Sequence, residues 1–352
     1  MSSDSNNNNI NKQYSNENTI NNEEESKELI SKDFVPHFLP TYRIKSSLYP
    51  FPIIVVIIIA GILAYLSYII AGIQVDGSYF PEEDFGPIGV LLNAIIFTSL
   101  AVVSGFIIIF LIKKKGINVL KYIFGISFGF MGFFLTTMFG EVIIFLIFIQ
   151  FPESSFLVNL YNVIINIVLP ISIGVFVFFL IYLYFTSKSI RFKNSIVLYF
   201  SLLIGGAMSI ILPLWTTLAI LIGVSLWDIF AVLYKKGPIK EMIDIASNSG
   251  DQTDIEQVEA NEKVKSGEAR YDTSKLEIGI GDLAFYSLLT SSILIHTNNL
   301  IITICCTIAI IIGTGITISG LKRNKILPGL PISIFLGIGT FLIFQLIVFL
   351  FF

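Results

Sequence analysis

Nine long apolar segments dominate the hydrophobic pattern of the chain, and each is long enough to cross a bilayer as a helix. The connections between them are polar, and none is large enough for a sizeable soluble domain. The fourth segment contains Pro170, which predicts a kink. The pattern therefore predicts an all-α polytopic membrane protein. The predicted helices span roughly residues 52–73, 88–112, 118–149, 155–186, 194–212, 214–234, 278–295, 299–320 and 331–352.

The polar intervals divide the chain into four parts. Residues 1–48 form a polar tail rich in Asn and Glu, which is predicted to be disordered because it has too little apolar surface to fold. Residues 49–234 hold the first six helices, and residues 235–277 form a hydrophilic loop. Residues 278–352 hold the last three helices.

Lys and Arg occur only in alternate connections, which sets the expected orientation. They precede the first helix and follow the second, fourth, sixth and eighth, whereas the other connections contain none. Positively charged loops face the cytoplasm. We therefore expect a cytoplasmic N-terminus, a cytoplasmic 235–277 loop and an outside C-terminus.

Composition supports the membrane assignment. The chain is 54% hydrophobic and only 13% charged, with a mean hydropathy of +0.82, whereas a soluble domain is about 25% charged. The expected partner is the lipid bilayer, not a nucleic acid, and the expected location is the cell membrane of a microbe. The Cys and His residues lack metal-site spacing, so neither a metal nor a cofactor is expected.

Two carboxyl groups lie inside these apolar segments: Asp228 in SLWDIFAVL and Asp282 in GIGDLAFYSLL. A charge in hydrocarbon is costly unless function retains it. The two helices are consecutive and antiparallel, and helix rise places Asp228 roughly 10 Å and Asp282 roughly 7–8 Å from the cytoplasmic side. The matching depth predicts that the two carboxyls share one site.

Paired carboxyls suit hydrolysis, because two carboxylates a few Å apart cannot both ionise cheaply. One group would polarise a carbonyl while the other takes a proton from water. The rival interpretation is a proton-coupled transporter or cation channel, since intramembrane carboxylates also relay protons. The absence of a visible inverted repeat in the sequence weighs against a transporter.

The residues around the second aspartate and before the last helix complete the predicted site. Gly279, Ile280 and Gly281 precede Asp282, and the two glycines would let the sixth helix or a substrate backbone approach closely. They also weaken the helix start, so residues 275–280 are expected to be extended. The run Pro328, Gly329, Leu330 and Pro331 lies on the same predicted face.

At these residues the chain resembles the presenilin family, particularly its archaeal members. The segment WDIFAVL is similar to the family's YD motif with Trp for Tyr, GIGD to its GxGD motif, and PGLP to its PALP motif with Gly for Ala. Signal peptide peptidases share related motifs but are understood to lie inverted in the membrane. The basic loops favour the presenilin orientation.

The resemblance implies an intramembrane aspartyl protease, an aspartic endopeptidase of membrane-protein substrates. It implies Asp228 and Asp282 as the catalytic pair, with the PGLP run shaping the site. The expected substrates are single transmembrane helices with their N-terminus outside, which must unwind locally before hydrolysis. A signal-peptide-peptidase-like protease is the alternative within the same chemistry.

Overall fold

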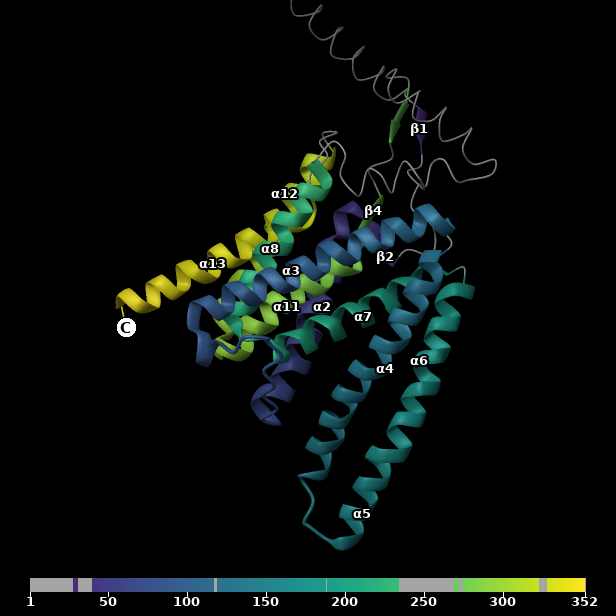
Figure 1. Ribbon diagram of the computed structural model, residues 1–352, viewed down its shortest axis with the longest axis vertical. Helices are drawn as coiled ribbons and strands as arrows, with labels where there is room; N and C mark the ends of the chain where they lie inside the picture. The colour runs from purple at the N-terminus through teal and green to yellow at the C-terminus, as the bar shows by residue number, and fades with distance from the viewer. Residues whose placement is uncertain are drawn as a thin grey trace, which may run out of the picture. The chain divides into compact units, whose positions relative to one another are not determined.

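Helices account for most of the computed structural model, which describes residues 28–30, 40–116, 119–187, 189–233, 269–271, 275–322 and 328–351. Each predicted apolar segment is helical (Figure 1), so the all-α polytopic fold is confirmed over these residues. The helices are α2 Pro50–Tyr65 with its extension η2 Leu66–Ile70, α3 Glu82–Lys115, α4 Val119–Phe148, α5 Ser155–Val163 with η3 Ile164–Val168 and α6 Leu169–Thr186, α7 Ile190–Ile211, α8 Leu214–Leu233, α11 Ile280–Thr297, α12 Leu300–Lys322 and α13 Leu330–Phe351.

Two helices differ in detail from their predicted form. Helix α3 begins at Glu82 rather than at residue 88, because an acidic first turn precedes a break at Gly86, whose φ is +53°. In the fourth segment the pattern of backbone hydrogen bonds changes to that of a π-helix, η3, which ends at Val168, two residues before Pro170. Pro170 then lies at the start of α6, inside the continuous helical segment Ser155–Thr186, where proline cannot donate a hydrogen bond to a carbonyl of the preceding turn.

Eight helical segments in the described part of the chain are long and apolar enough to cross a membrane, and α11 is the predicted span that falls short. Helix α11 carries Asp282, His296 and several Ser and Thr residues. It nevertheless lies at the centre of the bundle, where it packs against both α2 and α7, which also contact each other. Its neighbours therefore shield the most polar of the nine predicted spans from lipid.

Several polar side chains of α11 bond to its own backbone, whereas the buried hydroxyls of Ser291 and Ser292 have no partner among the described residues. The Ser287 hydroxyl donates to the Ala284 carbonyl at 3.0 Å, and the Thr290 hydroxyl donates to the Tyr286 carbonyl at 3.0 Å. Both side chains are buried, at 0% and 1% exposure. Satisfying these hydroxyls locally removes most of the cost of burying them.

A two-stranded antiparallel sheet lies at the start of α11. Strand β2, Thr41–Lys45, pairs with β4, Lys275–Gly279, with Arg43 opposite Glu277. The extended conformation predicted for residues 275–280 is confirmed for 275–279, while Ile280 begins α11. The assignment of residues 1–48 to a disordered tail is wrong for 41–48, which form β2 and the 3-10 turn Ser46–Leu48.

A separate small unit pairs strand β1, Glu28–Ile30, in parallel with β3, Ala269–Tyr271. Residues 1–27 and 31–39 of the predicted tail, and residues 235–268 and 272–274 of the predicted loop, lie outside the described residues. The orientation of the helices in the membrane stays a prediction.

Candidate active site

Helix α8 presents Asp228 near its C-terminal end. The other end of α8 is held by Glu82 of α3, whose Oε1 accepts hydrogen bonds from both the backbone N and the Oγ1 of Thr216, each at 2.8 Å. These bonds satisfy N–H and hydroxyl groups in the first turn of α8. Helix α8 packs against α3, α11 and α13, so three helices fix the position of the half-buried Asp228.

Asp282 lies in the first turn of α11, where the helix N-terminus favours a negative charge. The Gly279 backbone hydrogen-bonds to its carboxyl group, and the charge of Asp228 interacts with it electrostatically. The two aspartates therefore lie close enough to interact, in agreement with their matching predicted depth.

The PGLP run lies next to both carboxyl groups. The backbone N of Leu330 donates a long hydrogen bond, 3.4 Å, to Oδ2 of Asp228. A Cβ built on the neighbouring Gly329 would be 3.3 Å from Oδ2 of Asp282. Pro328 and Pro331 flank these residues and are buried. Elements from α8, α11 and the start of α13 thus converge, and every part of the predicted site is brought together.

The two glycines before Asp282 were predicted to let the sixth helix or a substrate backbone approach closely, and the structure bears only on the first of these. A Cβ on Gly279 would come no closer than 3.8 Å to Asp282, and one on Gly281 would meet only Phe285 at 3.9 Å. Both distances are ordinary van der Waals contacts, so close packing against the sixth helix, α8, requires neither glycine. The tight position is Gly329, where the added methyl group would press on the Asp282 carboxylate.

A network of buried hydroxyl groups, formed by Tyr286, Thr314 and Ser333, lies next to the PGLP run and was not predicted from the sequence. The Tyr286 hydroxyl lies 3.2 Å from Ser333 Oγ and 3.4 Å from the Gly329 carbonyl, and Thr314 Oγ1 lies 3.0 Å from Ser333 Oγ. Tyr286 follows Asp282 by four residues and so shares its helix face. That spacing was the available signal. The network ties α11, α12 and α13 together beneath the PGLP run.

These features define a polytopic membrane protein with two acidic side chains from neighbouring helices at one proline-flanked turn. A sequence model described as "Presenilin" matches residues 53–254 and 246–352. Since these matches cover most of the chain, it belongs to the presenilin family.

Individual relatives agree with this assignment. The chain is 38% identical over 134 residues to presenilin-B of Dictyostelium discoideum, covering 36% of this chain and 25% of that protein. It is 24% identical over 330 residues to a presenilin-like protein of Arabidopsis thaliana, covering 74% of this chain and 79% of that protein. The match to presenilin-B therefore spans only a quarter of that protein.

The fold is also similar to two crystal forms of a presenilin family intramembrane aspartate protease. Their TM-scores are 0.52 and 0.54, at 13% and 15% sequence identity. The matched regions cover 84% and 85% of this chain and 95% and 96% of those chains. At this level of identity the likeness establishes the shared fold.

Proposed function

We propose that this protein is an intramembrane aspartyl protease that hydrolyses peptide bonds within transmembrane helices, with Asp228 and Asp282 as its catalytic pair. The observation that carries the proposal is the convergence of both carboxyls on residues 328–331, Leu330 N bonding to Asp228 and Gly329 adjoining Asp282. Membership of the presenilin family supports the same reaction class.

The chemistry requires one carboxyl group to be protonated and the other ionised. The ionised group takes a proton from water as the water oxygen attacks the scissile carbonyl carbon, while the protonated group donates to the carbonyl oxygen. The tetrahedral intermediate then collapses and the C–N bond breaks. The first carboxyl gives the leaving nitrogen the proton that it took from water, and the second regains its proton from a hydroxyl of the intermediate. The two carboxyls act as one titrating pair, so acid and base are not assigned to individual residues.

Hydrolysis requires an unwound substrate, and β4 offers a place to hold one. In an antiparallel pair the backbone groups of successive residues point alternately toward and away from the partner strand. Ile280 N bonds to Pro40 O of the β2 side, whereas the backbone groups of Arg43, opposite Glu277, are bonded elsewhere, to Asn194. The N–H and C=O of Glu277 therefore point to the opposite edge of β4. An extended substrate can add there as a further strand.

A proline at position 277 tests strand addition. Glu277→Pro removes an N–H that faces this outer edge, at which no other strand pairs among the described residues, and it leaves the β2–β4 ladder intact, since proline is tolerated at strand edges. Glu277→Ala is the matched control for loss of the side chain. We expect the KM of the proline variant to exceed that of the alanine variant by about tenfold, the effect of a lost backbone hydrogen bond. Equal KM values in a folded pair would contradict strand addition.

The activity itself is tested with purified protein and a synthetic single-helix membrane peptide carrying a fluorophore and a quencher at its two ends. Cleavage in water enriched in ¹⁸O is expected to place one labelled oxygen on the new carboxylate, within the membrane segment of the peptide. Mass spectrometry of both products gives the position and the label. Proton or cation flux through reconstituted protein without cleavage would instead support the transporter interpretation.

A further inference from the structure

The sheet at the start of α11 contains a strand that the proposed mechanism does not use. Strand β2 comes from the segment before the first membrane helix, yet it pairs with β4 more than two hundred residues later. A two-stranded sheet alone is at best marginally stable in water. Something must therefore hold β2 in place, and the surrounding contacts identify what does.

The sheet is amphipathic, and its apolar face is anchored in the helical bundle. Tyr42 and Ile278 face each other and are 7% and 5% exposed. Ile44 and Leu276, the next pair on that face, pack against the same core. Side chains on the opposite face are polar, so burial fixes the register of the two strands: a slip by one residue would expose the apolar set.

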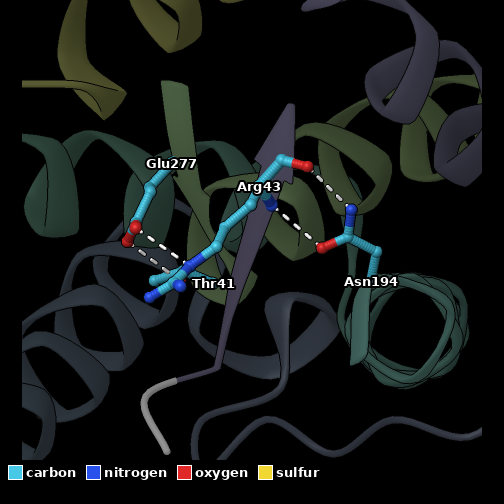
Figure 2. Close-up of polar contacts among 4 residues, drawn as sticks. All are labelled: Thr41, Arg43, Asn194 and Glu277. Carbon is cyan, nitrogen blue, oxygen red and sulfur yellow. Dashed lines mark hydrogen bonds and ion pairs between the residues drawn. The ribbon is translucent and has the colours of Figure 1, made fainter. Parts of the chain in front are cut away.

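The polar face carries a cross-strand ion pair, drawn in Figure 2. Arg43 Nε lies 2.9 Å from Oε1 of Glu277, and the Thr41 hydroxyl donates to Oε2 of the same carboxylate at 3.1 Å. Arg43 and Glu277 form a pair whose backbones do not bond to each other, the type in which side chains lie closest. Both oxygens of Glu277 are thus held from β2.

The outer edge of β2 is closed by a side chain of α7. Asn194 Oδ1 accepts from the backbone N of Arg43 at 2.9 Å, and Asn194 Nδ2 donates to the Arg43 carbonyl at 2.7 Å. Figure 2 shows this amide facing the Arg43 backbone on the side away from Glu277. A side-chain amide that satisfies both groups imitates a neighbouring strand. Another chain is thereby prevented from pairing at this position.

Helix α7 also holds the residue that follows β4. The Ser201 hydroxyl shares its proton between the Val197 carbonyl of its own helix, at 2.8 Å, and the Ile280 carbonyl, at 3.3 Å, and Ile280 N donates to the Pro40 carbonyl at 3.2 Å. Ile280 stands two residues before Asp282. The same helix therefore supports β2 through Asn194 and the start of α11 through Ser201, so the frame that holds β4 also orients Asp282.

We infer that β2 is a built-in sheet partner that keeps β4 extended, and that Asn194 closes the far edge, so that a substrate strand is directed to the edge of β4 beside Asp282. This inference rests on the proposed proteolytic function. Arg43, Asn194 and Glu277 are positioning residues: they act through the conformation of β4 and its open edge, and they touch neither water nor the scissile bond.

The inference is tested by kinetics of the full-length purified chain with the fluorogenic single-helix peptide. Asn194→Leu removes both bonds to Arg43, and Asn194→Asp removes only the donated one while keeping the side-chain size. We expect KM to rise about tenfold in the first and less in the second, with kcat changed by less than about twofold and the melting temperature nearly constant. Arg191→Glu, an exposed change on the same helix, is expected to leave KM unchanged.

The ion pair between Arg43 and Glu277 allows a second, independent test of the inference. Arg43→Glu and Glu277→Arg are each expected to raise KM and to shift the cleavage position, while the double exchange restores most of the loss. A cleavage position that shifts in the single variants and returns in the exchange distinguishes positioning from a general loss of stability, which would lower the amount of active protein without moving the cut. Unchanged KM and cleavage position in the Asn194 variants would overturn the inference, as would a lower KM, which would mean that β2 obstructs the substrate.

The Asp282→Asn variant separates failure of the positioning role from failure of the proposed proteolytic function. If the unmodified chain cleaves the peptide and loses that activity in Asp282→Asn, the proposed function stands, and the Asn194 and Arg43 variants decide the inference alone. If the unmodified chain does not cleave the peptide in an aspartate-dependent way, the proposed function is overturned together with everything that rests on it.

Discussion

Replacing either Asp228 or Asp282 with asparagine is expected to reduce intramembrane cleavage by at least about a thousandfold. Each carboxyl has a distinct task, because one must accept a proton from water and the other must donate to the carbonyl oxygen. An amide has the size of a carboxyl group, and it can donate a hydrogen bond, but it can neither take a proton from water nor give one up to the carbonyl oxygen. The measurement is kcat/KM for the single-helix peptide, with product analysis by mass spectrometry.

The double variant Asp228→Asn/Asp282→Asn sharpens this prediction. Groups that act as a unit are not additive, so the double variant should be no slower than the single ones. Removing the charge that the pair carries in a partly buried site should also keep or raise the melting temperature. Asp84→Asn is the matched control, because Asp84 likewise lies in the first turn of a membrane helix but is exposed. Activity surviving either single change would rule out the catalytic pair.

Gly205→Ala is expected to destabilise the protein by about 3 kcal/mol or more. A Cβ at this position of α7 would lie 1.9 Å from Ser287 Oγ, 2.8 Å from the Ala284 carbonyl oxygen and 3.0 Å from Leu288 N, all on α11. The Ser287 hydroxyl could rotate away, but the two backbone atoms can move only if the helices separate. Because α7 also supports the start of α11, cleavage activity should fall with stability.

The control for this change is Gly105→Ala in α3, where a Cβ would meet nothing within 4 Å. There alanine should leave stability unchanged or raise it slightly, since glycine is the poorer helix former. Melting temperature and yield of monodisperse protein in detergent measure both variants. A Gly205→Ala protein as stable as Gly105→Ala would show that α7 and α11 do not cross this closely.

Sequence alone was sufficient for the helices and for the residues that gather around Asp228 and Asp282. The length of an apolar run can be compared directly with the thickness of the bilayer. The rise per residue of a helix then converts a position within the run into a depth in the membrane. Those two rules placed both aspartates at one level, and the structure brings them to the same turn, at Leu330 and Gly329. Their catalytic role stays a proposal.

Strand β2 could not be found in the same way. The five residues TYRIK follow a long polar tail, and their alternation is too short to be distinguished from it. The pattern becomes informative only opposite KLEIG, a pairing between segments remote in sequence. The role of Asn194 could not be predicted for the same reason. Its two hydrogen bonds are made to the backbone of Arg43, and backbone groups are the same whatever amino acid stands at that position.

The central place of α11 has a consequence for how the protein is made. A segment carrying an aspartate, a histidine and several hydroxyl side chains partitions poorly into lipid as an isolated helix. Its main packing partners, α2 and α7, both precede it in the chain, so they have been synthesised before α11 emerges from the ribosome. Stable integration of α11 therefore depends on helices already in the bilayer. The segment that carries Asp282 therefore enters the membrane by packing against helices that were inserted before it.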